Sequence, residues 1–267
     1  MQGTPAEEVA VAQRPARFQI MFLGIMSSEL SIRRPTFAWS KETLEDQKDS
    51  AQKVAEINTY WERRIKEQRE LAITQGTEEY RYLGELNKEI VEGKSKWKRT
   101  RSAQQVFKPE VFERTCLREN DTSKGGIDWF LYREKILIPL LYPYIKEVQE
   151  ANPNKRVWFV DDNIGLHSKA HRSLADIAKR LGIKRVPFWP PNSPDLHPIE
   201  NAFDYLKDSI EGYEVANTSK NEKKQAGIFL CNEWSYKMDG IVRHLCLSFK
   251  DKLELCQKHK GRNNFRA

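Results

Sequence analysis

Short apolar runs alternate with long amphipathic stripes along this chain. The run from Phe18 to Met26 is apolar and rich in residues that favour strands, which predicts a buried strand that ends at Ser27. A second strand is predicted between Glu29 and Trp39. Pro35 lies within it and cannot donate to a sheet ladder, so an edge position or a break is expected there. Residues 1–17 show no periodicity and predict a disordered lead-in.

The next segment is highly charged and has helical periodicity. Its apolar residues recur at steps of three and four from Val54 to Ile65, and a second stripe runs from Tyr80 to Ile90. A break is predicted at Gln75–Thr77. These patterns predict a long charged helical insertion over about residues 40–100. A solvated spacer is favoured over a dedicated partner-binding element.

Beyond Gly125-Gly126 the pattern returns to a buried type. Asp128 is a predicted N-cap for a helix whose apolar stripe runs from Trp129 to Val148, and two prolines, Pro139 and Pro143, are expected to kink or split it.

An alternating strand and helix pattern follows. Strands are predicted at Arg156–Val160 and Lys184–Trp189, with an amphipathic helix at Ser168–Leu181 between them that Gly182 closes. Pro198 suits the first turn of the next helix. This order predicts an α/β unit with a right-handed crossover and a parallel pair of strands.

The C-terminal part, residues 216–267, is predicted to be a helical extension. A polar linker at Asn217–Lys224 precedes one or two helices that end near Lys258.

Composition excludes several classes of protein. With 267 residues, of which 39% are apolar, the chain is long enough for a sizeable core. No stretch approaches the roughly 18 apolar residues that a membrane helix needs, so no membrane association is expected. The four cysteines form no CxxC pair, which favours a soluble protein in a reducing, intracellular compartment. The net charge of +7 fits a polyanionic partner but is also common on ordinary soluble proteins.

One short stretch concentrates positive charge around a tryptophan. Cations neutralise phosphates, while an indole stacks on a base or a sugar, so the stretch is a candidate DNA contact. An exposed basic loop without a ligand is an equal alternative. The residues are Lys94, Lys96, Trp97, Lys98, Arg99 and Arg101.

Two carboxylates stand where side chains converge outside the edge of a sheet. Asp162 follows the predicted strand Arg156–Val160, and Glu200 opens the helix after a proline-rich turn. Carboxylate oxygens suit Mg²⁺ or Mn²⁺, and a pair of such ions stabilises the attacking and leaving oxygens of a phosphoryl displacement. Phosphodiester cleavage is therefore the predicted reaction class. Asp161 precedes Asp162, and the two side chains point in opposite directions if side chains alternate, so this pattern alone leaves open which of them is the ligand.

The wording of these motifs resembles the DDE transposase catalytic domain of the mariner-like superfamily, also called the DDE superfamily endonuclease. One matching segment runs from Val160 to His167, and the other, more specific one from Ser193 to Asn201. The family's usual wording in the second is Ser-Pro-Asp-Leu-Asn-Pro-Ile-Glu-Asn, from which this chain departs at His197. Further similarity lies in Trp189-Pro190, Phe203, Leu206-Lys207, Gly125–Trp129 and Phe18–Ser27.

The resemblance implies a ribonuclease-H-like core, a mixed sheet flanked by helices, over residues 18–215 with the helical insertion inside it. It implies that Asp162 and Glu200 are the second and third catalytic acids and ligands of Mg²⁺ or Mn²⁺. It also implies that the partner is DNA, which in the family means the transposon ends. The implied location is the nucleus, and the implied reaction is DNA cleavage with strand transfer during transposition. A homodimer is left open. Supporting roles near the acids are assigned to Asn163, His167, Asp195 and Asn201.

The chain departs from the family pattern at the first catalytic aspartate. That residue belongs to a strand upstream of Phe18–Ser27, whereas the first aspartate here is Asp46. We therefore expect a domain truncated at its N-terminus, which binds metal weakly and whose cleavage is impaired. The alternative is a catalytically inactive, transposon-derived module that binds DNA or protein.

Several residues have a structural interpretation beside the functional one. His167 contacts phosphate or orients a ligand, or else caps a helix or faces solvent. Asp195 is favoured as a turn residue that binds backbone. A zinc site on the C-terminal helix is disfavoured because its spacing matches no standard finger; its residues would be His244, Cys246, Cys256 and His259. Packing is expected for Trp61, Trp129 and Trp158, in contrast to Trp97.

Overall fold

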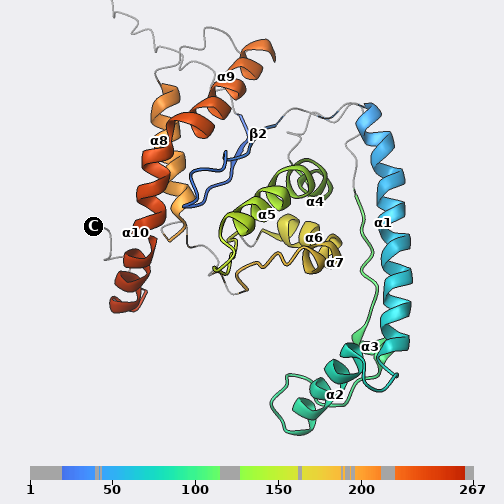
Figure 1. The fold of residues 1–267 in the computed structure, drawn as a ribbon. Coiled ribbons are helices and arrows are strands. Elements are labelled where there is room, and N and C mark those ends of the chain that lie inside the picture. Colours follow the sequence, from blue (N-terminus) through green and yellow to red (C-terminus); the bar gives the residue numbers. More distant parts are fainter. Residues whose placement is uncertain are drawn as a thin grey trace, which may run out of the picture. The chain divides into compact units, whose positions relative to one another are not determined.

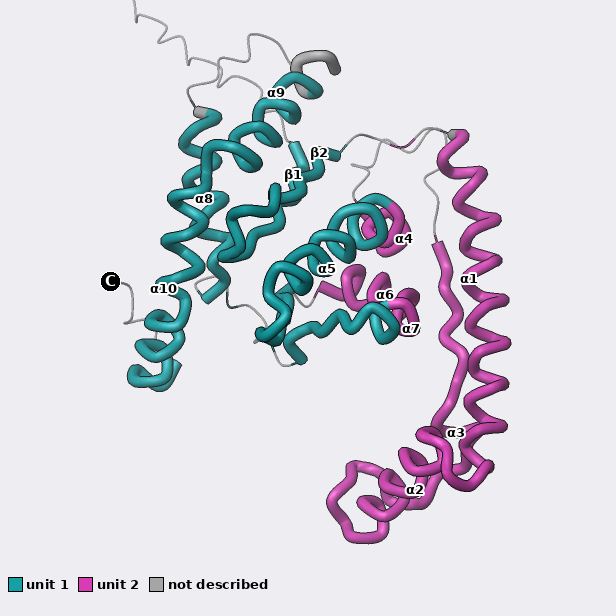
Figure 2. The backbone as a smooth tube through the Cα atoms, viewed as in Figure 1, with its two compact units in different colours: residues 1–40, 135–163, 178–267 teal, residues 41–134, 164–177 magenta. Residues whose placement is uncertain are grey.

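The computed structural model describes residues 20–39, 42, 44–114, 127–161, 164–187, 189, 193, 196–211 and 220–261. This part of the chain is mostly helical, with one two-stranded sheet (Figure 1). It divides into two compact units (Figure 2). Unit 1 comprises residues 1–40, 135–163 and 178–267, and unit 2 comprises residues 41–134 and 164–177. The predicted lead-in at 1–17 lies outside the described residues, as does the Gly125-Gly126 break.

Unit 1 contains the two-stranded sheet. Strands β1 (Phe22–Gly24) and β2 (Thr36–Ala38) are antiparallel, with Leu23 opposite Phe37. Both predicted strands are thus confirmed, although each is shorter than its apolar run. Pro35 stands just before β2 and only accepts, through its carbonyl, from the amide of Ile25 at 3.3 Å. The proline therefore limits the ladder as its missing N–H requires.

The core of unit 1 forms where C-terminal helices cover this sheet. It is built by α8 (Pro198–Glu211), α9 (Lys220–Asn232), a π-helical turn (Glu233–Lys237) and α10 (Asp239–Lys258). Trp234 is fully buried, with the rings of Phe22 and Phe203 at 5.9 and 5.5 Å, and its indole N–H donates to Ile25. One or two C-terminal helices were predicted, and the structure has α9 and α10, but α9 begins at Lys220, so the linker predicted over Asn217–Lys224 is wrong at its end.

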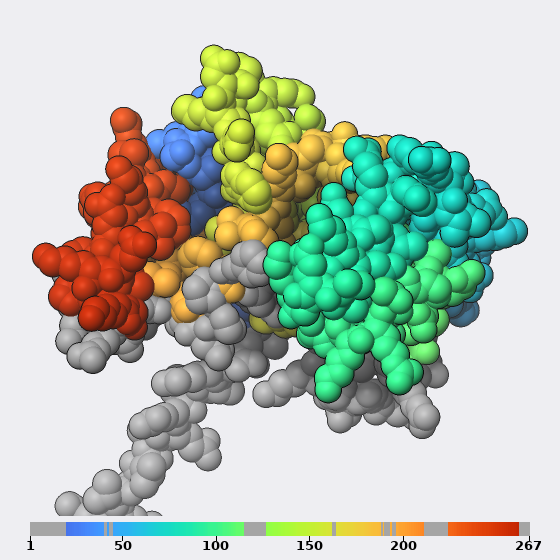
Figure 3. Space-filling view, turned by 90° about the horizontal axis from the view of Figure 1, so that it is seen from below, coloured from blue at the N-terminus to red at the C-terminus, as the bar shows by residue number. Residues whose placement is uncertain are grey.

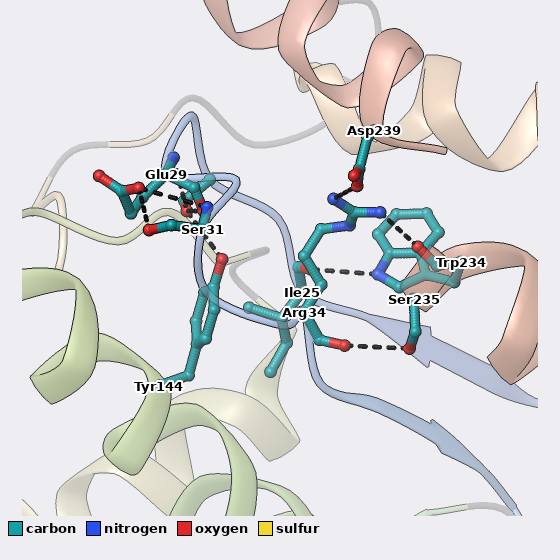
Figure 4. Close-up of polar contacts among 9 residues, drawn as sticks. Ile25, Glu29, Ser31, Arg34, Tyr144, Trp234, Ser235 and Asp239 are labelled. Atoms are coloured by element: carbon teal, nitrogen blue, oxygen red, sulfur yellow. Dashed lines mark hydrogen bonds and ion pairs between the residues drawn. The ribbon is translucent and has the colours of Figure 1, made fainter. Parts of the chain in front are cut away.

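A buried arginine fastens the β1–β2 connection to these helices (Figure 4). Arg34 donates to the carboxylate of Asp239 at 2.5 Å and to the carbonyl of Trp234 at 2.6 Å. Its own carbonyl accepts from Ser235 at 3.1 Å. On the other side of the connection, the hydroxyls of Ser27 and Tyr144 are 2.7 Å apart. These contacts satisfy most of the polar groups that the turn brings into the core.

A continuous helical run carries Tyr144. It consists of α4 (Trp129–Tyr132), a π-helical segment (Arg133–Leu141) and α5 (Tyr142–Ala151). Asp128 caps it as predicted, because its carboxylate accepts from the amide of Leu131 at 2.8 Å. The two prolines do not split the run into separate helices. Pro139 lies inside the π-helical segment, where the backbone is already displaced from regular α geometry, and Pro143 lies in the first turn of α5.

Unit 2 is built on a helical pair. Helix α1 (Leu44–Leu71) is followed by α2 (Glu78–Val91), and the break between them lies where it was predicted. Thr77 caps α2 by accepting from the amide of Tyr80 at 3.1 Å. After α2 comes a loop, residues 92–102, that is exposed for most of its length, and then the short α3 (Ala103–Val106). Residues near 100 on the colour bar lie on the surface in Figure 3.

An extended segment then returns along α1, held by side chains of that helix. Arg69 donates to the carbonyl of Phe107 at 2.8 Å, and Asn58 pairs with both backbone groups of Phe112 at 2.8 and 3.0 Å. Helix α6 (Gly165–Ser173) is also joined to α1, because the indole N–H of Trp61 donates to the carbonyl of Ser173. The charged insertion is thus an outgoing helix and a returning strand-like segment joined by α2.

The predicted strand–helix–strand unit is present in reduced form. Phe159 and Arg185 form an isolated parallel bridge, with hydrogen bonds of 3.0 Å to Lys184 and 2.9 Å from Val186. The parallel orientation is therefore confirmed, but the expected full strands are wrong. Pro187 follows Val186 directly, and because it has no N–H it offers no donor to a further strand on the edge that faces away from Phe159.

The intervening helix is also interrupted. Instead of one helix over Ser168–Leu181, the chain forms α6 and then α7 (Ala175–Arg180), with Leu174 between them. Gly182 closes α7 at a φ of 64°, as its predicted capping role requires. Within the described residues, one antiparallel pair and one parallel bridge are the only strand pairings. No helix among these residues is long and apolar enough to cross a membrane.

Candidate functional site

The first candidate site is the pair of motif carboxylates. Glu200 lies in the first turn of α8, which begins at Pro198 as predicted. Its side chain is exposed, and its amide donates to the carbonyl of His197 at 3.2 Å. The N-terminal end of a helix favours a carboxylate there. Asp162, Asn163 and Asp195 lie outside the described residues.

The parallel bridge relates the two motifs to each other. The first bridged strand leads at its carboxyl end into Asp161, and the second leads into Trp189. Carboxyl ends of parallel strands lie at the same edge of a sheet, which is where ligands bind in α/β proteins. Both motif segments therefore begin from one edge in unit 1.

Packing fixes the turn that delivers Glu200. The ring of Trp189 lies 5.5 Å from His197 and 6.2 Å from Phe249 of α10. Leu196, the residue before His197, is buried. His197, the residue at which the motif differs from the family wording, thus has a packing role in this turn. Asn201, the next residue after Glu200, is half-buried on α8.

Charges along α8 also reach the candidate acid. Lys207 forms an ion pair with Asp204 at 2.8 Å. The pKa of Lys207 is raised, first by the hydrogen bond that its ammonium donates to Asp204 and to a smaller extent by the charge of Glu200. Glu200 itself makes no side-chain hydrogen bond or ion pair with other described residues.

His167 belongs to unit 2. It lies in α6 and stacks on Tyr132, with ring centres 3.9 Å apart and an interplanar angle of 20°. Ile164 is the N-cap of that helix, so the capping interpretation of His167 is wrong. His167 is half-buried against Tyr132, and its proposed phosphate contact stays a prediction.

The zinc alternative receives no support from the part of the chain that the structure describes. No group of three or more His, Cys, Asp or Glu residues there is arranged to hold a metal ion. Cys246 instead packs against the core cluster of Trp234 and Val242. Burial raises the pKa of its thiol to about 11, although the charge of Arg34 opposes this shift.

The second candidate site is the basic loop, residues 94–101 in unit 2. Trp97 is 41% exposed, the guanidinium carbon of Arg101 lies 4.0 Å from its ring centre, and the Lys96 ammonium lies at 5.4 Å. Lys98 and Arg99 are exposed. Lys94 forms an ion pair with Glu92 at 2.6 Å. The loop thus presents an indole with cations beside it, and Arg101 is committed to that indole.

Another exposed indole was not expected. Packing was predicted for Trp158, but this residue is 47% exposed, so that prediction is wrong. Trp129 is buried and Trp61 half-buried, as packing requires. Alternation around Trp158 in the sequence, with Arg156 two residues before it, could have indicated the open face.

No protein-family model matches the chain, and the searches of the curated proteins and of the solved structures found no match.

Proposed function

We propose that the chain is a transposase-derived endonuclease domain of the DDE type, with a ribonuclease-H-like origin and impaired activity. Its ancestral reaction is metal-dependent cleavage of DNA phosphodiesters followed by strand transfer, and its expected location is the nucleus. The observation that supports this best is the parallel bridge between Phe159 and Arg185, because it starts both motif segments at one edge. The motif wording around Asp162 and Glu200 supplies the rest of the argument.

The proposed chemistry needs divalent cations. Asp162 and Glu200 would bind Mg²⁺ or Mn²⁺ through carboxylate oxygens, and the exposed side chain of Glu200 fits this role. Such ions neutralise the charge that develops on the phosphoryl oxygens. Two acids bind them more weakly than three, so the expected cleavage is slow.

A nicking assay tests the proposal. Supercoiled plasmid DNA is incubated with the full chain and Mn²⁺, and the appearance of open circles is followed. We expect slow nicking that Glu200→Gln and Asp162→Asn each reduce by at least about tenfold, since each removes a metal ligand. The matched control is Asp204→Asn on the same helix, where an exposed carboxylate is removed without loss of nicking.

Two outcomes of the nicking assay would contradict the proposal. Nicking that survives Glu200→Gln, or that falls equally in the Asp204→Asn control, contradicts a site at Glu200. The absence of any nicking contradicts the enzymatic function and leaves the second candidate.

That second candidate is an inactive module that binds DNA through the basic loop. It is favoured by the geometry at Trp97, whose partly exposed ring is flanked by Lys96 and Arg101. Phosphate contacts make binding fall with salt, with a slope of about −0.9 per contact on duplex DNA. Changing Lys96, Lys98, Arg99 and Arg101 together to Gln should therefore make the plot of log affinity against log salt concentration less steep, by about three to four.

A matched control removes the same number of charges elsewhere. Lys48, Lys66, Lys250 and Lys258 are exposed lysines on α1 and α10. Changing these four to Gln should lower the slope less than the loop variant does. If the two variants behave alike, the affinity comes from net charge and not from the loop.

A further inference from the structure

The exposed face of the bridged pair in unit 1 combines an indole with positive charge. Side chains alternate along extended backbone, so Arg156 and Trp158 lie on one face, and Val157 and Phe159 lie on the other. Burial follows this alternation, because Arg156 and Trp158 are exposed while Val157 and Phe159 are half-buried. One face of this pair is therefore open to solvent.

The second bridged strand adds to the same face. Phe159 pairs with Arg185, so Lys184 lies beside Trp158. Its ammonium is 5.7 Å from the centre of the indole ring, which is a cation–π distance. Lys184 and Gly182 are exposed, whereas Ile183 between them is buried. We call this surface, formed by Arg156, Trp158, Gly182 and Lys184, the Trp158 face.

Its composition selects among possible ligands. The four residues of the Trp158 face include two cations, one large aromatic ring and no carboxylate. An apolar protein partner would leave Arg156 and Lys184 desolvated without a counter-charge. A polyanion with stackable rings satisfies all three groups, since phosphates pair with the cations and a base covers the indole. Duplex DNA hides the faces of its bases, whereas a single strand offers them.

We propose that the Trp158 face binds single-stranded nucleic acid, with one base stacked on Trp158 and flanking phosphates on Arg156 and Lys184. This binding needs neither Asp162 nor Glu200, so it holds whether or not the chain cleaves DNA. It also lies in unit 1, on different residues from the basic loop of unit 2.

Fluorescence anisotropy of a labelled 12-nucleotide oligothymidylate tests the proposal. The full chain is titrated in buffer with EDTA, so that metal-dependent cleavage plays no part. Trp158→Ala should weaken binding about tenfold, and Trp158→Phe should weaken it less, because stacking by a smaller ring persists. Affinity for a blunt 12-base-pair duplex should change by less than about twofold. Lys184→Gln and Arg156→Gln should each reduce the steepness of log affinity against log salt concentration by about 0.7, the value for one phosphate of a single strand.

The matched control is Tyr205→Ala, which removes another exposed aromatic ring of unit 1 from α8. It should leave oligothymidylate binding unchanged. Because Lys184 is exposed, the Lys184→Gln variant remains informative if Trp158→Ala does not fold. Equal affinity of wild type and Trp158→Ala, or equal losses on single strand and duplex, overturns the proposal. So does a dimer in sedimentation that Trp158→Ala dissociates, since the face would then bind a second copy.

Discussion

The guanidinium of Arg114 donates to the carboxylate of Glu42 at 2.6 Å, although 72 residues separate them in the chain. A second nitrogen donates to Asp128 at 2.6 Å, and the guanidinium carbon lies 4.7 Å from the centre of the Phe130 ring. The Arg114 side chain is 4% exposed. Burial disfavours its charge, but the hydrogen bonds that it donates to Glu42 and Asp128 outweigh this, and its pKa is raised. The chain just before α1, the end of the returning segment and the cap of α4 are thus joined by one cation.

Arg114→Met should destabilise unit 2 strongly. The substitution keeps much of the side-chain volume but leaves two partly buried carboxylates without their cation, which costs about 3 kcal/mol. Urea unfolding followed by circular dichroism measures the change in the free energy of unfolding. The control is Lys53→Met, whose pair with Glu134 is longer at 3.4 Å and more exposed, so a change of about 0–1 kcal/mol is expected. Equal effects of the two variants would contradict a structural role for Arg114.

Two glycines should respond oppositely to alanine. A Cβ on Gly24 would lie 2.5 Å from two ring carbons of the buried Trp234, so Gly24→Ala should destabilise unit 1 by at least about 1–3 kcal/mol. A Cβ on Gly84 of α2 meets nothing within 4 Å, so Gly84→Ala should stabilise by up to about 1 kcal/mol through helix propensity. Thermal unfolding of both variants provides the measurement. A neutral Gly24→Ala would mean that Trp234 moves aside without cost.

Stability should fall at alkaline pH through Cys246. Its pKa rises from 9.0 when unfolded to about 11 when folded, chiefly because burial disfavours the thiolate. Between these values the unfolded chain loses the proton first, so the free energy of unfolding decreases as pH rises from about 9 to about 11. The difference between wild type and Cys246→Ala in urea unfolding isolates this contribution. A difference that stays constant across that pH range would show that the thiol titrates normally.

Local signals in the sequence predicted much of the fold. The break before α2, the cap at Asp128 and the closure at Gly182 each depend on a residue whose own backbone or side chain forces the geometry. Such signals need no knowledge of distant residues. The start of α8 at Pro198 has the same origin, which is why the position of Glu200 on a helix could be predicted.

What the sequence did not predict depends on tertiary contacts. The run before Asp161 indicated a strand, and packing was expected for Trp158, but packing requires a second layer over that face, and Trp158 is exposed. The stack of His167 on Tyr132 joins α6 to α4, which are distant in sequence. The same holds for Arg34, whose partners lie about 200 residues away.

Asn87 should control the order of the basic loop. Its side-chain amide accepts from the backbone N–H of Arg101 at 2.7 Å and donates to the carbonyl of the same residue at 2.9 Å. These two hydrogen bonds tie the end of the loop to α2, and each contributes about 1 kcal/mol. Asn87→Ala should therefore speed tryptic cleavage within residues 94–101 by roughly tenfold or more, because cleavage follows the population of the opened loop.

The control for this prediction is Asn58→Ala on α1, which removes the equivalent pair of hydrogen bonds to the backbone of Phe112. It should loosen the returning segment and leave the rate of cleavage in the basic loop unchanged. Mass spectrometry of early peptides distinguishes the two sites. If Asn87→Ala does not accelerate cleavage of the loop, Arg101 is held by its stack on Trp97 and not by Asn87. If Asn58→Ala accelerates it equally, the two asparagines stabilise one cooperative unit and not two separate attachments.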